Sequence, residues 1–412
     1  MQRSDHRILT THAGSLPRPP ALVELFVRTS RREPVDEVGL AAAVEAATRH
    51  VVTQQLAAGI DVGNNGEQPR ESFFTYVQHR MTGFGGQSQR PIMRDIVAYP
   101  SFLELKLPDF SRTMVSLVNA PKAIGPVRYA DRSALETECA EYRRIAGEHA
   151  DGFAESFMTA PSPGIVAAAM LNEHYPTIDA YVDALGAALR TEYEFIVAQG
   201  FVLQIDAPDL AMERHTMFAD RPLADFLRFV DHTVAAINAA LANVPRDRVR
   251  LHVCWGNYEA PHHLDVSLEE ILPHLYAARV GALMLSMANP RHAHEYRCFA
   301  HHPLPADMLL IAGVIDPTTN YVEHPEVVAD RIERVATVVG DPTRVLAGTD
   351  CGFDTAAGLG EVAAQGTNSQ SVTVEPSAEA GNRWPTSRTS RPATAGTGAC
   401  AALRRCAIRA SR

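Results

Sequence analysis

The sequence has few of the features that mark membrane, secreted or nucleic-acid-binding proteins. It contains no run of about 18 apolar residues, so we expect no transmembrane helix. The first 20 residues lack the apolar core of a signal peptide, and six cysteines in 412 residues are too few for a disulfide scaffold. Both observations predict a cytoplasmic protein. A net charge of −10 argues against binding nucleic acid through a basic face.

The composition is that of a globular chain up to about residue 360, where the sequence changes character. With 46% hydrophobic and 21% charged residues, the chain as a whole is neither disordered nor fibrous. From residue 361 to 412 Ala, Ser, Thr and Gly dominate, and seven arginines stand against three glutamates. No helical or strand period of apolar residues is visible there. We therefore predict a folded body over residues 1–355 and a disordered, low-complexity tail over 361–412.

Short apolar segments alternate with longer amphipathic ones along the body, which predicts an α/β fold with a parallel sheet. Eight such units close a TIM-type (β/α)8 barrel, the architecture we expect. An open doubly wound sheet is the alternative, but the Gly-x-Gly-x-x-Gly turn that would support it is missing. Nine strands are predicted, so one, residues 123–127, is expected to be accessory. The predicted strands are 7–13, 59–63, 123–127, 157–160, 201–206, 249–255, 281–287, 308–315 and 345–348, and the main predicted helices are 41–58, 178–199, 222–242, 268–279 and 324–339.

A barrel places its chemistry at the carboxyl ends of the strands. His252 and Cys254 are two residues apart on a predicted strand and therefore share one face of it. Cys351 follows the end of another predicted strand, with Cys298 as its one plausible competitor. One imidazole and two thiolates are typical of a catalytic zinc site with an open position. The residues alone leave ordinary packing of these side chains as an equal alternative.

Five segments, each at a predicted strand end, form a recognisable series. They are TTHAGSLPR at 10–18, GIDVGNNGE at 59–67, QIDAP at 204–208, LHVC at 251–254 and TDCG at 349–352. In this order they resemble the cobalamin-independent methionine synthase family, specifically its C-terminal catalytic barrel without the extra N-terminal barrel. The resemblance covers residues 7–355 and misses the tail.

This resemblance implies an enzyme, a zinc-dependent S-methyltransferase that makes methionine. In the best-known members a methyl group passes from 5-methyltetrahydropteroyltriglutamate to homocysteine, so the implied partners are a small-molecule thiol and an alkyl donor. The implied cofactor is a zinc ion (Zn²⁺). The residues that fall on the family's zinc ligands are His252, Cys254 and Cys351, and those that fall on the substrate site are Gly14, Ser15, Glu67 and Asp206, with Arg18 as a candidate for the folate carboxylates.

Two departures from the family pattern limit this transfer. Ser286 stands where the family has a glutamate zinc ligand, so the site has three protein ligands unless Glu295 or His292 reaches it. Residues 317–320, Pro-Thr-Thr-Asn, stand where the family has its catalytic histidine, and Asp316 is our candidate to replace that histidine.

Three alternatives stay open at this point. The first is thiol addition of the kind catalysed by epoxyalkane–coenzyme M transferase, a related branch that needs no folate. The second is a metal-free barrel resembling uroporphyrinogen decarboxylase. The third is a defective family member, because the unusual tail stands where the last barrel helix is expected.

Overall fold

The computed structural model describes residues 1–106, 115, 117, 120–319 and 321–357. The predicted tail, residues 361–412, lies outside them. Within the described chain, no helix combines the length and apolar character needed to cross a membrane. Seven strands form one parallel sheet in the order β1-β4-β5-β6-β7-β8-β9. These strands are β1 (Val62–Gly63), β4 (Glu155–Pro161), β5 (Val202–Asp206), β6 (Val249–Val253), β7 (Ala282–Leu285), β8 (Leu309–Ile315) and β9 (Val345–Thr349).

The N-terminal segment closes this sheet into a barrel. The amide of Thr11 donates to the carbonyl of Ala347 on β9, and the amide of Ala347 donates to Leu9. On its other side, the carbonyl of Thr10 accepts hydrogen bonds from the amides of Asp61 and Val62, where β1 begins. Because the segment bonds to both edge strands, it acts as the eighth strand. The predicted (β/α)8 barrel is confirmed, with β1, β5, β6, β7 and β8 shorter than expected.

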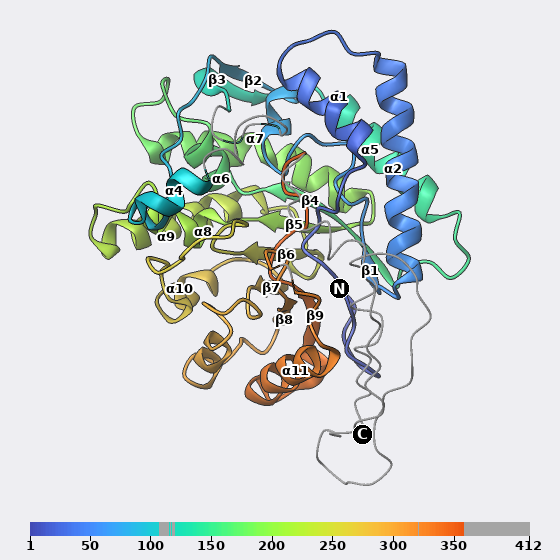
Figure 1. The fold of residues 1–412 in the computed structure, drawn as a ribbon, viewed down its shortest axis with the longest axis vertical. Helices are drawn as coiled ribbons and strands as arrows, with labels where there is room; N and C mark the ends of the chain where they lie inside the picture. The colour runs from blue at the N-terminus through green and yellow to red at the C-terminus, as the bar shows by residue number, and fades with distance from the viewer. Residues whose placement is uncertain (107–114, 116, 118–119, 320, 358–412) are drawn as a thin grey trace.

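The helices surround the barrel, as Figure 1 shows, with α1, α2 and α5 on one side and α8, α9 and α10 on the other. The five main helices predicted from the sequence correspond to α2, α7, α9, α10 and α11. The helices are α1 (Pro20–Ser30), α2 (Glu37–Ala57), α3 (Arg94–Val97), α4 (Pro100–Lys106), α5 (Ser133–Ala146), α6 (Pro163–Ala169), α7 (Ile178–Ala198), α8 (Asp209–Met212), α9 (Leu223–Ala240), α10 (Leu268–Leu275) and α11 (Pro325–Val339).

The strand predicted at residues 123–127 is accessory, as expected. It forms β3 (Lys122–Tyr129), which pairs antiparallel with β2 (Met81–Gly85) in a separate two-stranded sheet. This two-stranded sheet contacts α7 through β3 and lies at one end of the molecule in Figure 1. Its antiparallel pairing shows that it is not one of the barrel's repeating units.

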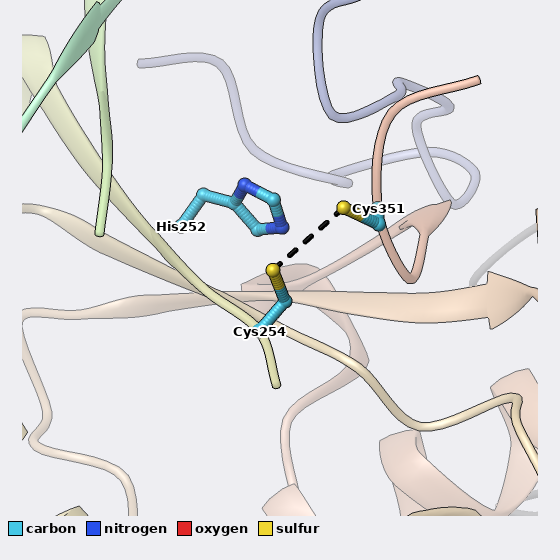
Figure 2. A group of neighbouring side chains, drawn as sticks. All are labelled: His252, Cys254 and Cys351. Carbon is cyan, nitrogen blue, oxygen red and sulfur yellow. Dashed lines mark hydrogen bonds between the residues drawn. The ribbon is translucent and has the colours of Figure 1, made fainter. Parts of the chain in front are cut away.

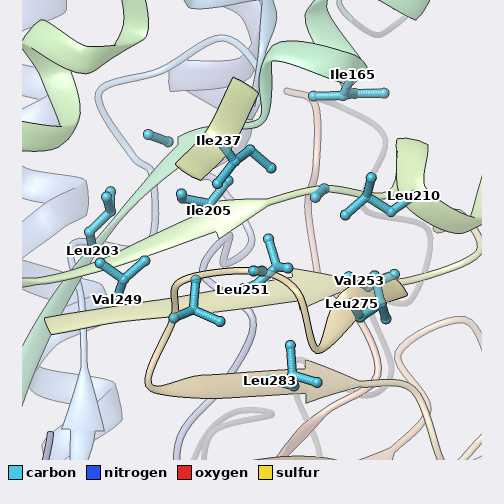
Figure 3. Packing of buried hydrophobic residues seen from close by; sticks show 14 of the residues in the cluster. Ile165, Leu203, Ile205, Leu210, Ile237, Val249, Leu251, Val253, Leu275 and Leu283 are labelled. Carbon is cyan, nitrogen blue, oxygen red and sulfur yellow. The ribbon is translucent and has the colours of Figure 1, made fainter. Parts of the chain in front are cut away.

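Apolar residues pack in two layers on either side of the barrel wall. The larger layer lies between strands and helices, where Leu203, Leu251 and Ile237 meet (Figure 3). The smaller cluster, which includes Phe157, Met284 and Ile311, belongs to the other face of the same strands. Residues alternate between these layers along each strand because successive side chains point to opposite faces. On β6, Leu251 faces the helices, so its neighbours Arg250 and His252 face the barrel interior.

Candidate metal centre

Three side chains with metal-ligand chemistry meet at the end of the barrel where the strands finish. One potential ligand atom from each of His252, Cys254 and Cys351 lies within 4.8 Å of the other two. The two sulfur atoms are 3.7 Å apart, and Figure 2 shows the edge of the imidazole turned toward them. All three residues are buried, with between 3% and 6% of their surface exposed. Among the described residues, this is the one group that has such a geometry.

Local structure explains how these residues meet. His252 lies on β6 and Cys254 follows its last residue, so the two side chains point to the same side. Cys351 lies two residues beyond the end of β9, next to Gly352. A Cβ atom on Gly352 would lie 2.0 Å from the hydroxyl oxygen of Ser15, so glycine allows the Cys351 turn to pack against residue 15. The barrel therefore joins two loops that are about 100 residues apart in sequence.

The three side chains of the cluster strongly shift one another's pKa values. The hydrogen bond from the Cys351 thiol lowers the pKa of Cys254 well below its usual value, with a further contribution from the positive His252 ring. The same hydrogen bond raises the pKa of Cys351. Burial favours neutral His252, but the Cys254 thiolate and the Asp206 carboxylate outweigh burial and raise its pKa to about 10. A buried thiolate that needs a neighbouring positive charge fits a site for a soft cation.

Asp206 fixes the orientation of His252. Its Oδ1 atom lies 2.8 Å from Nδ1 of the imidazole, which leaves Nε2 to face the sulfur atoms. A carboxylate that holds the far nitrogen of a histidine is the usual outer partner in zinc sites. The donor set and this support therefore both fit zinc.

Two buried carboxylates next to the cluster each have one oxygen without a partner. Asp206 Oδ2 and Glu67 Oε2 have no hydrogen-bond partner among the described residues. Glu67 Oε1 accepts a hydrogen bond from the Thr159 hydroxyl at 2.8 Å. Burial, followed by the negative charge of Asp206, raises the pKa of Glu67 to about 7. Two unpaired carboxylate oxygens in a buried site are suited to binding a cationic group such as an ammonium.

The loop that contains Gly14 and Ser15 packs tightly against Glu67. Gly14 has φ +125°, and a Cβ atom there would lie 2.9 Å from Glu67 Oε1 and 2.7 Å from a methyl of Thr159. Its amide donates to Nδ1 of His12 at 3.2 Å. Ser15 is buried beside it. The structure thus brings Gly14 and Ser15 next to Glu67, as a substrate pocket built from these residues requires.

Arg18 lies in the same region but its guanidinium is fully used within the protein. It pairs with Asp354 at 3.0 Å and donates to the backbone carbonyls of Glu67 and Arg70. These contacts hold the chain from Glu67 to Arg70. The geometry gives Arg18 a role in fixing this loop, and its predicted contact with substrate stays a prediction.

Neither residue suggested as a fourth ligand points to the cluster. His292 stacks on Trp255 with ring centroids 3.9 Å apart, and its two nitrogens bond to Asp265 and Glu295. Glu295 also accepts from the amide of Leu268. Both side chains are therefore held in a separate network, and the donor set contains three protein ligands.

Ser286 and Asp350 support the cluster from one side. The Ser286 hydroxyl donates to the backbone carbonyl of Asp350 at 2.9 Å, and the same carbonyl lies 3.3 Å from Nε2 of His252. The Asp350 carboxylate accepts from the amides of Met287 and Ala288 at 2.8 and 2.9 Å. Ser286 therefore acts through the backbone next to Cys351.

Asp316, our candidate for the catalytic role, is buried just after β8. Its Oδ1 atom accepts from the amide and hydroxyl of Thr318. Its charge is close enough to contribute, after burial, to raising the pKa of Asp350 to about 6. A direct role in proton transfer stays a prediction.

Sequence reasoning gave no role to Gln204 or Arg250, which lie directly below the cluster. Arg250 is 1% exposed and bonds to Gln204, and Gln204 bonds to Asp206. A signal was present in the sequence: both positions are two residues before a site residue on the same strand, so they share its face. Arg250 could have been identified as a charged side chain at a position that the strand pattern turns toward the barrel interior.

Comparison with known proteins gives a consistent result. The family model described as "Cobalamin-independent synthase, Catalytic domain" matches residues 8–373. A methionine synthase from Sulfolobus acidocaldarius is 24% identical over 346 residues, which cover 84% of this chain and 85% of that protein. A 2-hydroxypropyl-CoM lyase from Xanthobacter autotrophicus is 30% identical over 150 residues, 30% of this chain and 40% of that one.

A solved structure supports the fold. It is a B12-independent methionine synthase from Shewanella sp. W3-18-1, in complex with selenomethionine. It matches with a TM-score of 0.64 and 20% identity, covering 84% of this chain and 91% of that one.

Proposed function

The chain belongs to the family of cobalamin-independent synthase catalytic domains, and on this basis we propose that it is a zinc-dependent enzyme that transfers a methyl group to the sulfur of homocysteine. The observation that carries the proposal is the position of the His252, Cys254 and Cys351 cluster beside two carboxylates with unpaired oxygens. A metal-ligand cluster and a cation-binding pair side by side suit a substrate that has both a thiol and an ammonium.

The donor set supports zinc as the metal. Nε2 of His252 and the sulfurs of Cys254 and Cys351 would hold the ion, while Asp206 keeps the imidazole oriented through Nδ1. A zinc ion bound there would keep the acceptor thiol ionised at neutral pH, and the ionised thiol is the nucleophile in alkyl transfer. The ligands are nearly fully buried, which limits the access of water to them.

The two carboxylates support an amino acid as the acceptor. An ammonium between Glu67 Oε2 and Asp206 Oδ2 would satisfy both unpaired oxygens. It would also relieve the repulsion between the two carboxylates that helps to raise the pKa of Glu67. Backbone groups of Gly14 and Ser15 next to Glu67 would hold the substrate carboxylate. This arrangement fixes one end of the substrate and directs its thiol to the metal.

Thiol addition to an epoxide is the second candidate. It is favoured by the similarity to the 2-hydroxypropyl-CoM lyase and by the missing glutamate ligand at Ser286. Coenzyme M has a sulfonate and no amino group, so it offers nothing to pair with Glu67 and Asp206. The paired carboxylates therefore favour homocysteine.

The metal assignment is tested by measuring zinc in the purified protein. We expect a full equivalent of zinc in the wild type, and its loss in Cys254→Ser and in Cys351→Ser, because hydroxyl oxygen is a poor ligand for this ion. Cys298→Ser is the matched control. Because Cys298 lies outside the cluster, this variant should keep a full equivalent of zinc.

The choice of thiol is tested on the metal-loaded protein. Titration with homocysteine and with coenzyme M, monitored by the absorbance of a cobalt-substituted sample, should show binding of homocysteine at much lower concentration. A protein without zinc, or with zinc unaffected by both cysteine substitutions, would overturn the metal site. Tighter binding of coenzyme M would favour the second candidate.

A further inference from the structure

Arg250 is a charged side chain enclosed within the barrel. Its guanidinium lies 3.5 Å above the centroid of the Phe157 ring and is 1% exposed. Burial lowers its pKa to about 9. It donates hydrogen bonds to Gln204 Oε1 at 2.7 Å, to the Thr11 hydroxyl at 3.0 Å and to the His12 carbonyl at 3.0 Å. A buried charge is costly, and this one is compensated only by a specific set of partners.

These partners determine which way the Gln204 amide faces. Arginine has only donors, so the group of Gln204 that faces Arg250 must be the carbonyl oxygen. The amide nitrogen then faces the opposite side, where it donates to Asp206 Oδ1 at 2.7 Å and to the Ala13 carbonyl at 2.6 Å. The Ala13 carbonyl and the Asp206 carboxylate only accept hydrogen bonds, so they require the same orientation of the amide. Arg250, Ala13 and Asp206 together hold the Gln204 amide in one orientation, in which its nitrogen donates to Asp206.

The contacts of this pair reach both halves of the amino-acid site. Through Thr11, His12 and Ala13, it holds the chain that leads directly into Gly14 and Ser15. Through the Gln204 amide, it holds the oxygen of Asp206 that also accepts from His252. With Oδ1 occupied twice, Oδ2 is the oxygen that is left for a ligand.

We propose that Arg250 and Gln204 are positioning residues that set the distance between the Gly14–Ser15 loop and Asp206, and so make the site selective for a thiol that carries both an α-amino and an α-carboxyl group. This inference rests on the proposed function. The pair acts through Asp206 and the loop and touches neither substrate nor metal. It therefore affects the recognition of the amino-acid end, while a thiol without that end binds independently of it.

The first test measures the binding of L-methionine to the metal-free protein by isothermal titration, because the amino-acid end is the same as in homocysteine and no metal is needed. We expect Gln204→Met to weaken binding about tenfold, as the loss of one hydrogen bond to a charged group does. Gln204→Glu keeps the acceptor for Arg250, and with it the packing of the barrel, but loses the donor to Asp206; it should weaken binding at least as much.

Arg250→Met should weaken binding through the same route, so the double variant with Gln204→Met should lose no more than the larger single effect. Ile311→Val is the control, since Ile311 belongs to the apolar cluster on the inner face of the strands, away from this chain of hydrogen bonds. It should bind L-methionine like the wild type.

The second test separates positioning from general damage. Binding of 2-mercaptoethanol to the cobalt-loaded protein, followed by absorbance, should be the same in Gln204→Glu and in the wild type. Equal losses for both ligands, or unchanged L-methionine binding in both Gln204 variants, would overturn the inference. A wild-type protein that binds neither L-methionine nor homocysteine would refute the proposed function instead.

Discussion

At the scale of single residues, Glu67 is held in an unusual state. It has φ +56°, in the left-handed region that side chains other than glycine rarely adopt. The preceding glycine, Gly66, is also left-handed, and the Glu67 amide donates to the Asn65 side chain. This strained turn lets the carboxylate lie beside Asp206 in the interior. Strain of this kind is common where a loop has to present a side chain to a ligand.

The pKa of Glu67 gives a prediction for ligand binding. Below about pH 7 Glu67 is protonated in the free protein, so it offers no charge to an ammonium. We expect the affinity of the metal-free protein for L-methionine to rise with pH, by up to about tenfold per unit, and to level off above pH 7. Isothermal titration between pH 5.5 and 8 measures this.

Two variants check the source of that pH dependence. Glu67→Gln should bind L-methionine more weakly and without the rise. Glu71→Gln should keep the wild-type profile, because Glu71 bonds to His79 and Gln78 instead. A flat profile in the wild type would contradict the prediction.

At the scale of elements, the junctions after β4 and β5 are linked by a buried carboxyl. The Ser162 hydroxyl accepts from the amide of Ile165 and so caps α6, and it donates to Asp209 at the start of α8. A Cβ atom on Gly164 would lie 2.0 Å from Asp209 Oδ2, so α6 can approach α8 only with glycine there. Burial raises the pKa of Asp209 to about 7.

This raised pKa predicts how stability depends on pH. An unfolded chain releases the Asp209 proton near pH 4, while the folded protein keeps it until about pH 7. The contribution of this proton to stability is therefore complete at low pH and is lost as the pH rises toward 7, at about 1.4 kcal/mol per unit. Asp209→Asn has no such proton. Between pH 5 and 7 the wild type should lose about 2 kcal/mol relative to this variant.

Urea unfolding of both proteins at the two pH values provides the measurement. Asp220→Asn serves as the control, since Asp220 is 80% exposed and should leave the wild-type slope unchanged. Parallel slopes for the wild type and Asp209→Asn would show that Asp209 is ionised in the folded protein.

At the scale of the whole molecule, closure of the barrel depends on the N-terminal segment, which bonds to β9 and to the start of β1. Asp61 fastens it: its Oδ2 atom accepts from the amide of Thr10 at 2.8 Å and from the Thr10 hydroxyl at 3.0 Å, and the carboxylate pairs with Arg7. The Asp61 side chain thus makes part of the pairing between the N-terminal segment and β1. This explains why β1 has only two residues where five were predicted.

We expect Asp61→Ala to lower the free energy of unfolding by about 2 kcal/mol, because it leaves the buried amide of Thr10 without a partner. Hydrogen exchange should locate the effect. The amides of Thr11 and Ala347 should exchange faster, while those of β5 and β6 keep their protection. Asp307→Ala, which removes an exposed ion pair with Arg246, should cost less than about 1 kcal/mol. If all barrel amides lost protection from hydrogen exchange equally, the effect of Asp61 would not be local to the N-terminal segment, and the prediction would be wrong.

The sequence by itself determined the alternation of strands and helices and the shared face of His252 and Cys254. These follow from periods of two and 3.6 residues, which depend only on neighbours along the chain. Tertiary structure alone decided that Cys351 meets His252 and Cys254, that Asp206 divides its oxygens between His252 and an open position, and that Gln204 bridges Arg250 and Asp206. These contacts depend on which strands lie side by side and in which register, and no local pattern contains that information.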